Sequence, residues 1–237
     1  MNDIQVQCEL GQEQLMRMEY LAAERTLAAA EEAALRQQDF DALARLYMPL
    51  QEARRQRRQR CGEGVIRLDL IARDSSQQIS GRDILEKFPH GQLLVAGWGS
   101  IQPAVQIRRL QTRRGLYVDA FLAAVYPTPS HPVVAIVPLE APLPPPQPMP
   151  LEELVRLLPS GSLVMPVDQI PPPTYSNVMA LWERLHAPFL AAADAQSDPL
   201  QKIDAYRLAI AVDYACELAH QDLSDLAKRL CKSPSAP

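Results

Sequence analysis

The sequence predicts an α/β fold, with a small, mainly parallel sheet of about four strands and helical hairpins at both termini. Two observations favour this class. Residues 12–61 and 174–232 carry apolar residues at helical spacing, whereas residues 62–173 contain the short apolar runs typical of strands. Helix-like stretches separate these runs, which is the order expected of an α/β layer with right-handed crossovers.

The N-terminal hairpin, residues 12–61, is predicted to hold two helices. The first runs from about residue 13 to residue 37. The turn Asp39-Phe40-Asp41 follows, and either of its aspartates would cap the second helix. Pro49 lies inside that second helix and is expected to bend or break it. Gly62 would end it, because glycine is favoured in the left-handed conformation that follows a helix.

The sheet segment, residues 62–173, contains four runs typical of strands. The first alternates apolar and charged residues and predicts a half-exposed strand. The second and third are continuously apolar and suit strands that are buried on both faces. The predicted strands cover residues 65–72, 92–96, 132–137 and 162–167. The helix-like stretches between them cover residues 80–88, 100–114, 116–126 and 150–158, with Ser80 as the expected cap of the first and Ser100 of the second.

The C-terminal hairpin, residues 174–232, begins with a helix over residues 178–193. A second long helix would start with Asp198 as its N-cap and Pro199 in its first turn. Both terminal hairpins are rich in alanine and flank the sheet segment, so we expect 174–232 to pack with 12–61. The residues after Lys232 are expected to fray.

Charge and cysteine content exclude several classes of protein. The net charge is −4 and is spread evenly along the chain, so no segment has the basic excess that nucleic-acid binding requires. The four cysteines are far apart and form no Cys-x-x-Cys pair, which favours reduced thiols in the cytoplasm. No apolar run approaches the length of a membrane span, and the first residues do not resemble a secretory signal.

Proline is unusually frequent, with 22 prolines against 9 glycines. Fifteen of the prolines fall between Pro127 and Pro173, and the densest stretch is the linker at residues 141–150. Such a stretch is stiff and extended, so we interpret it as a rigid crossover linker. Its Pro-x-x-Pro spacings leave docking on an aromatic groove as the alternative.

The first hairpin resembles a single degenerate tetratricopeptide hairpin over residues 27–50. Small residues at Ala30 and Ala34, the turn at residues 38–41 and Tyr47 carry the resemblance. Three residues depart from the family pattern, namely Glu31, Leu43 and Pro49. Because such repeats are interaction surfaces, the resemblance implies that the chain binds a protein partner.

The turn Gly97-Trp98-Gly99-Ser100 is the strongest candidate for a ligand site. It follows a buried strand and opens a helix, so its backbone amides and the helix N-terminus would hold a phosphate or carboxylate. In parallel sheets ligands sit at this end of the strands. Asp74 and Asp168 follow two other predicted strands and are candidate residues of the same site. The alternative is a tight strand-to-helix turn with no ligand.

The arginine-rich run at residues 54–60 is a second candidate surface. Arg54, Arg55, Arg57 and Arg58 lie near the C-terminal end of the second predicted helix, where the helix dipole favours cations. They are expected either to form a solvated helix end or to contact a partner. The balanced charge around them favours an acidic protein surface over nucleic acid.

Two Glu-x-x-His pairs at the C-terminal end suggest a metal site. Glu183 with His186, and Glu217 with His220, would each lie on one helical face. Two such pairs with single glutamates from two further helices build a dimetal carboxylate site, and the available glutamates are Glu24 or Glu31 together with Glu52. The competing interpretation is a solvated polar stripe on each helix.

Taken together, these patterns predict a non-catalytic interaction or regulatory module with a protein partner and no membrane or nucleic-acid contact. The alternative is an α/β domain that binds or transforms an anionic, phosphorylated small molecule at residues 97–100. No cofactor motif is found, and the sequence leaves open whether the chain is an enzyme.

Overall fold

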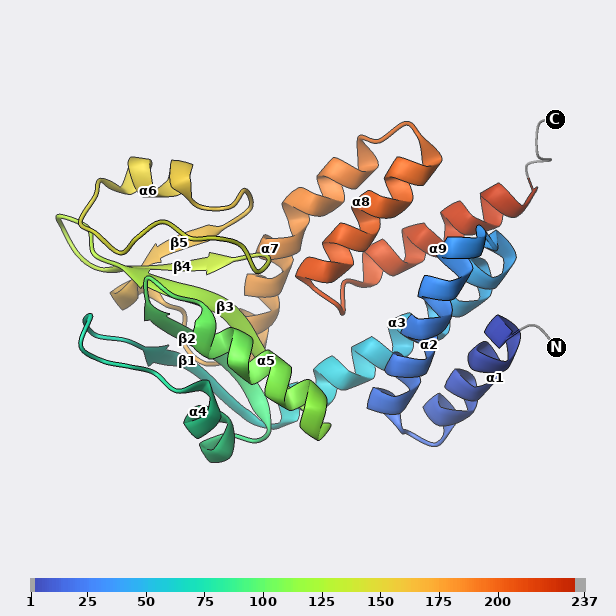
Figure 1. Ribbon diagram of the computed structural model, residues 1–237, viewed down its shortest axis with the longest axis horizontal. Helices are drawn as coiled ribbons and strands as arrows, with labels where there is room; N and C mark the ends of the chain where they lie inside the picture. The colour runs from blue at the N-terminus through green and yellow to red at the C-terminus, as the bar shows by residue number, and fades with distance from the viewer. Residues whose placement is uncertain (1–2, 233–237) are drawn as a thin grey trace. The chain divides into compact units, whose positions relative to one another are not determined.

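The computed structural model describes residues 3–232, which are drawn in Figure 1, so the fraying expected after Lys232 lies outside the described residues. The chain forms two compact units. The helical unit comprises the residues up to 58 and those from 189 onward, and the sheet unit comprises residues 59–188. In the part of the chain that is described, no helix is both long and apolar enough to cross a membrane.

Helices and strands alternate through the middle of the chain and helices occupy both ends. The helices are α1 (Asp3–Met16), α2 (Tyr20–Gln37), α3 (Phe40–Glu63), α4 (Gly81–Lys87), α5 (Gln102–Arg114), α6 (Leu151–Leu157), the 3-10 helix η1 (Val167–Gln169), α7 (Tyr175–Asp194), α8 (Pro199–Val212) and α9 (Glu217–Lys232). The strands are β1 (Val65–Ile71), β2 (Gly91–Trp98), β3 (Val118–Tyr126), β4 (Val133–Val137) and β5 (Leu163–Pro166).

The sheet unit is built on one mixed sheet with the strand order β1-β2-β3-β4-β5. β1, β2 and β3 are parallel and are joined by α4 and α5, whereas β4 and β5 are antiparallel to their neighbours. The predicted α/β class with helices at both termini is confirmed. The sheet has five strands instead of about four, and the parallel order is confined to its first three.

The additional strand is β3, which the sequence pattern assigned to a helix over residues 116–126. That assignment is wrong. Every residue of β3 is buried, so its sequence shows no alternation of polar and apolar residues. A fully buried strand and a buried helix cannot be told apart by periodicity alone. β3 pairs with β2 from Gly91↔Val118 to Trp98↔Val125 and forms the centre of the sheet.

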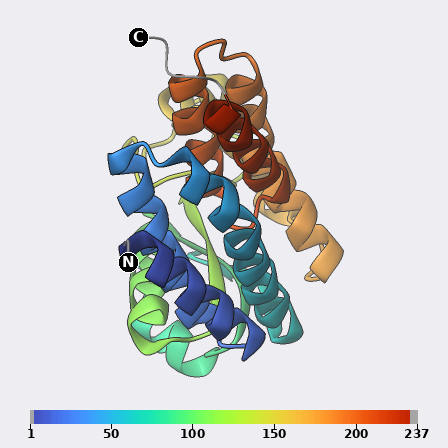
Figure 2. The same ribbon diagram turned by 90° about the vertical axis from the view of Figure 1, so that its right-hand side faces the viewer.

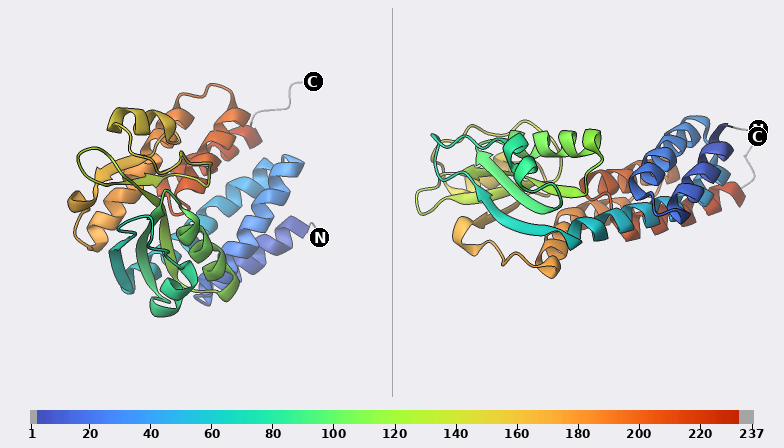
Figure 3. Two further views of the ribbon diagram at one scale, coloured as in Figure 1. Left: turned by 60° about the vertical axis from the view of Figure 1, so that its left-hand side comes forward. Right: turned by 90° about the horizontal axis from the view of Figure 1, so that it is seen from below.

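Helices cover both faces of the sheet. On one face, Leu93 of β2 and Leu122 of β3 belong to a core shared with α4, α5 and α6. On the other face, the ring of Phe121 stacks on Trp182 of α7, with 4.2 Å between the ring centroids. Figure 3 shows α5 and α7 on opposite sides of the sheet. The sheet is therefore the middle layer of this unit, and its strand ends carry the loops.

The helical unit has a separate core. Ala30 and Ala34 of α2 pack with Leu43 and Tyr47 of α3 in one buried cluster that also includes residues of α8 and α9. α1 and α2 run side by side, as the two views in Figures 1 and 2 show. Helical hairpins near both termini, expected from the sequence, are confirmed.

Three of the four predicted terminal helices begin or end differently from the prediction. The helix expected over residues 13–37 is two helices, because the chain turns at Met18, which has a left-handed φ of 61°. The second helix of the C-terminal hairpin is also divided, since the Asp213 side chain accepts a hydrogen bond from the Ala215 amide at 3.1 Å and forms a turn. Neither break contains the glycine or proline that would have signalled it.

The third is α3, which continues through Pro49, so a break there is wrong, and it ends at Glu63, one residue after the predicted end at Gly62. Leu46 and Leu50 on either side of Pro49 are fully buried, and their packing outweighs the roughly 3 kcal/mol cost of a proline inside a helix. A Cβ at Gly62 would lie 2.3 Å from the ring of Tyr175, so the glycine here permits close packing and does not end the helix.

Three of the predicted helix caps, Asp39, Ser80 and Asp198, are observed. The Asp39 carboxylate accepts from the Ala42 amide at 2.9 Å at the start of α3. Ser80 caps α4, and the Asp198 carboxylate accepts from the Gln201 amide at 2.8 Å at the start of α8. Short polar side chains therefore marked these three helix starts, whereas the predicted cap Ser100 does not cap α5, whose N-cap is Ile101.

Candidate functional site

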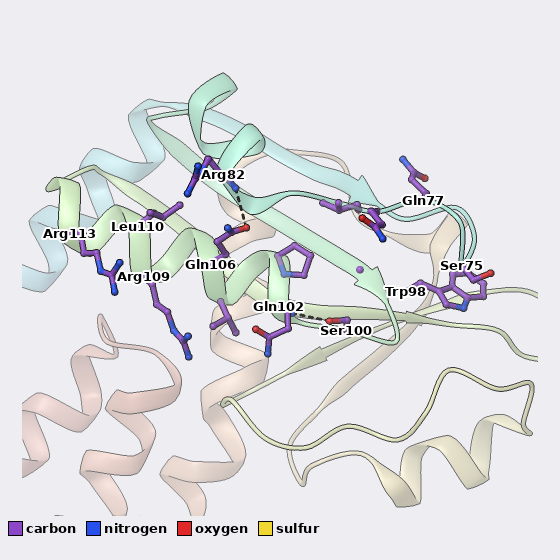
Figure 4. A pocket seen from close by; sticks show the side chains of 15 residues that line it. Ser75, Gln77, Arg82, Trp98, Ser100, Gln102, Gln106, Arg109, Leu110 and Arg113 are labelled. Carbon is purple, nitrogen blue, oxygen red and sulfur yellow. Dashed lines mark hydrogen bonds between the residues drawn. The ribbon is translucent and has the colours of Figure 1, made fainter.

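A cavity of about 690 Å³ lies in the sheet unit beside the turn at residues 97–100. The end of β2, the loop between β1 and α4, and one side of α5 form its walls, as Figure 4 shows. Gly97, Trp98 and Ser100 are among its lining residues. The strand-to-helix turn singled out from the sequence therefore borders an open cavity.

The turn itself is closed by its own hydrogen bonds. The Gly97 amide donates to the Ser100 carbonyl at 3.1 Å, the Ser100 amide donates back to the Gly97 carbonyl at 3.3 Å, and the Gly99 amide donates to the Val125 carbonyl at 2.8 Å. Ser100 Oγ accepts from the Gln102 amide at 3.2 Å. These amides are occupied, so an anion in the cavity would be bound by side chains.

Glycine is required at the centre of this turn for two reasons. Gly99 has a left-handed φ of 58°, which residues with a Cβ rarely adopt. In addition, a Cβ at Gly99 would lie 2.5 Å from Cβ of Pro146. The proline-rich segment at residues 141–150 thus packs against the turn through Pro146.

Arginine and glutamine side chains give the cavity its chemistry. Arg82 extends from α4, and Arg109 and Arg113 extend from α5. The glutamines that line the cavity are Gln77, Gln78, Gln102 and Gln106. None of its described lining residues is an aspartate or glutamate. Three guanidinium groups around one cavity produce a positive potential that favours anions.

Some of these side chains already have partners that shape the cavity. Gln106 Oε1 accepts from the Arg82 backbone amide at 3.3 Å and so connects α5 to α4. Arg109 Nη2 donates to Glu140 Oε2 at 3.2 Å, in a pair whose side chains are 63% and 49% exposed. An exposed pair of this kind contributes little stability, so Arg109 can exchange Glu140 for a bound anion.

The two aspartates predicted near this site lie at the same edge of the sheet but not in the cavity. Asp74 follows β1 and is exposed, and its carboxylate accepts from the Ser76 amide at 2.8 Å and from the Ser76 hydroxyl at 2.5 Å. These hydrogen bonds lower the pKa of Asp74. Asp168 is exposed in η1 after β5. Three strand spacings of about 4.8 Å separate β5 from β2, which places Asp168 away from the turn.

Three arginines of the predicted partner surface are engaged inside the helical unit. Arg54 and Arg57 both pair with Glu24, at 3.4 Å and 2.9 Å. Arg58 Nη2 donates to Asp213 Oδ1 at 2.8 Å, and both side chains are only 5% exposed. These side chains connect α3 to α2 and to the residue after α8, and Arg54 and Arg58 are buried.

Arg55 differs from its neighbours because it is exposed. Its guanidinium donates two hydrogen bonds to Glu52, at 2.8 Å and 2.7 Å, one turn earlier on the same helix. These bonds lower the pKa of Glu52. Of the four arginines predicted to meet a partner, Arg55 is thus the one with an exposed side chain.

The two Glu-x-x-His pairs belong to different units. Glu183 and His186 are in the sheet unit, and Glu217 and His220 are in the helical unit. Glu183 and Glu217 are exposed, whereas His220 is fully buried. Among residues 3–232 the structure brings together no group of three or more His, Cys, Asp or Glu that could hold a metal ion.

Both ring nitrogens of His220 are hydrogen bonded. Nδ1 donates to the Cys216 carbonyl at 2.7 Å, because a carbonyl can only accept, and this leaves Nε2 to accept from Arg54 Nη1 at 2.9 Å. Burial and the positive charge of Arg54 lower the pKa of His220 to about 3. The ring is therefore neutral and serves as a buried acceptor for an arginine.

The residues that define the cavity chemistry were not identified from the sequence. A signal was present on α5, since Gln102, Gln106, Arg109 and Arg113 follow the spacing of one helical face. A polar stripe on a helix normally faces solvent, and these four residues are indeed exposed, so this spacing alone does not indicate a cavity. The contribution of Arg82 depends on the packing of α4 against α5, which the sequence does not reveal.

Comparison of the chain with protein-family models, with curated proteins and with solved structures gives no match in any of the three. The tetratricopeptide resemblance of residues 27–50 gains no support from these comparisons.

Proposed function

We propose that the sheet unit binds an anionic, phosphorylated small molecule in the cavity beside residues 97–100. The observation that carries this proposal is the charge of the cavity. Arg82, Arg109 and Arg113 line a space of about 690 Å³ whose described lining residues include no carboxylate. No catalytic step is assigned to this site.

Arginine suits this role for physical reasons. Its planar guanidinium group donates two parallel hydrogen bonds to a phosphate, and it stays charged at any physiological pH. The three arginines come from two helices whose mutual position is fixed by the bond between Gln106 and the Arg82 amide. Glutamine amides beside them add donors that carry no charge and do not repel the cations.

The proposal is tested by titrating the protein with pyrophosphate and tripolyphosphate and measuring binding by calorimetry and melting temperature. A ligand at a hundredfold excess over its Kd stabilises the folded state by about 2.7 kcal/mol. Arg109→Gln and Arg113→Gln should each weaken binding about tenfold, since a hydrogen bond to a charged group contributes about 1.5–3 kcal/mol. Arg114→Gln is the matched control, because Arg114 is exposed on the same helix and does not line the cavity.

Two outcomes would contradict the proposal. One is the absence of any stabilisation by either anion at low salt. The other is an equal loss of affinity in the Arg114 control, which would mean that anions bind to the general charge of α5. Glu140→Gln offers a check in the opposite direction, since releasing Arg109 from this exposed pair should tighten binding.

A second candidate function, an interaction module, is favoured by one feature of the helical unit. Val6, Leu10, Met16 and Met18 expose 43%, 44%, 76% and 66% of their surface on α1 and the turn after it. Contiguous exposed apolar surface often marks a protein contact, and these four residues all lie within residues 6–18. A tagged chain carrying Met16→Glu and Met18→Glu should lose a bound partner that the Leu218→Glu control retains. If both variants capture the same partner, this surface does not contact it.

A further inference from the structure

We propose that the ligand of the cavity is a nucleoside polyphosphate, with its base stacked on Trp98 and its phosphates held by the three arginines. This inference rests on the proposed anion-binding function. It adds the chemical class of the ligand and an aromatic contact that anion binding alone does not require.

The chemistry of the cavity is distributed along its length. Trp98 and Ser75 lie at one end, and Arg109 and Arg113 lie towards the other, as Figure 4 shows. Gln102 and Arg113 are eleven residues apart on α5, which corresponds to about 16 Å at 1.5 Å per residue. Arg109 and Arg113 lie in the C-terminal half of α5, at the end of the cavity away from Trp98. An extended ligand with an aromatic end and an anionic end matches this arrangement.

Trp98 has the position expected of a stacking residue. It ends β2, it lines the cavity, and it is only partly buried. The other tryptophan, Trp182, is 4% exposed and already stacks on Phe121. Stacking of a base on an aromatic side chain is tolerant of base identity, and its loss on substitution weakens binding several-fold to more than a hundredfold.

Gln77, on the loop after β1, lies at the same end of the cavity as Trp98, as Figure 4 shows. Gln77 Oε1 accepts from the Arg73 amide at 2.8 Å, which fixes the side chain and leaves its amide hydrogens as donors. Gln77 and Gln78 both line the cavity on the loop after β1. Amide donors and acceptors at the Trp98 end match the polar edge of a base or the hydroxyls of a ribose.

The experiment uses the full chain and compares ATP, GTP, adenosine and tripolyphosphate. The chain has two tryptophans and Trp182 is buried, so a change in fluorescence on ligand addition reports on Trp98. We expect ATP or GTP to bind at least about tenfold more tightly than tripolyphosphate and to change the emission. Calorimetry with Trp98→Leu should show nucleotide affinity lowered to that of tripolyphosphate, with tripolyphosphate affinity unchanged. Trp98→Phe keeps an aromatic ring and should retain most of the nucleotide affinity.

The outcomes separate this inference from the proposed function. If nucleotides and tripolyphosphate bind equally and Trp98→Leu alters neither, the nucleotide inference is overturned while anion binding stands. If Trp98→Leu weakens tripolyphosphate and ATP by the same factor, Trp98 shapes the cavity and does not stack on a base, and the inference is also overturned. If none of the four compounds binds, both proposals are overturned. Melting curves of both variants without ligand show whether each is folded.

Discussion

The buried histidine of the helical unit predicts a stability that falls as the pH is lowered. His220 has a folded-state pKa lowered to about 3, whereas a histidine in an unfolded chain titrates near 6.5. Between these two pKa values the histidine is protonated in the unfolded chain and neutral in the folded chain. The contribution of His220 is therefore fully present above about pH 6.5 and is progressively lost as the pH falls towards 3.

The size of this effect follows from the two pKa values. Each pKa unit of difference corresponds to 1.36 kcal/mol, so His220 should remove about 2.7 kcal/mol of stability between about pH 7.5 and about pH 4.5. This is a large share of the roughly 5–15 kcal/mol that stabilises a typical domain. The physical cause is geometric, since a proton on Nε2 would face the Arg54 guanidinium 2.9 Å away in a site with no exposure to solvent.

The test compares the wild-type chain with His220→Gln by urea unfolding, followed by far-ultraviolet circular dichroism. Glutamine can donate to the Cys216 carbonyl and accept from Arg54 without titrating. The variant should be less stable at about pH 7.5, and the difference from wild type should shrink by about 2.7 kcal/mol at about pH 4.5. His131→Gln is the matched control, because His131 is exposed. A difference that is the same at both pH values would refute the reasoning.

A second buried group in the same unit acts in the opposite direction, which is why the comparison with the variant is needed. Burial raises the pKa of Glu31, against the lowering effect of Arg54 and Arg207. A carboxyl whose pKa is raised in the folded state gains stability as the pH falls through that pKa. Glu31 is present in both wild type and His220→Gln, so its contribution cancels in the difference between their unfolding free energies. The pH dependence that remains in this difference comes from His220.

Two further predictions concern a buried ion pair of the helical unit and a tight turn of the sheet unit. Asp213→Ala should cost about 3–5 kcal/mol in urea unfolding, because it leaves the Arg58 guanidinium buried without its carboxylate; a loss below about 1 kcal/mol would contradict this account. Gly99→Val should lower the unfolding free energy by about 3 kcal/mol. Backbone strain contributes about 1–2 kcal/mol of this loss, and overpacking against Pro146 contributes about 1–3 kcal/mol. Gly115→Val is its control, since Gly115 has a similar φ of 65° and nothing within 4 Å of its Cβ position, so equal losses in the two variants would exclude a role for the proline contact.

The sequence predicts those parts of the fold whose signals are local. Asp39, Ser80 and Asp198 cap helices as expected, because capping involves only a side chain and amides two or three residues away. The half-exposed strand β1 and the buried strand β2 are also where the pattern placed them. Signals that need knowledge of distant partners fail. Gly62, for example, has the local signal of a helix end, but its role is to make room for the ring of Tyr175, which is distant in the sequence.

The same distinction explains the candidate sites. A run of arginines in a sequence carries no information about which acids will meet it. Arg58 pairs with Asp213, which is 155 residues away in the sequence, and Arg54 pairs with Glu24, which is 30 residues away. What the sequence presents as one basic surface is divided by the fold into buried ion pairs and an exposed Arg55. Charge density alone therefore predicted a partner surface where the structure has mainly ion pairs within the chain.

At the cavity the sequence pattern indicated the correct place, but the predicted means of binding was different from what the structure shows. Two glycines after a buried strand indicated the correct place, because a tight turn is needed to bring α5 back over the sheet. The expected chemistry of free backbone amides does not follow, since the turn satisfies its own amides. An anion could bind there only through groups that approach from outside the turn. The packing of α4 on α5 supplies such groups, because it brings Arg82 to the same cavity as Arg109 and Arg113, which lie one turn apart towards the C-terminal end of α5.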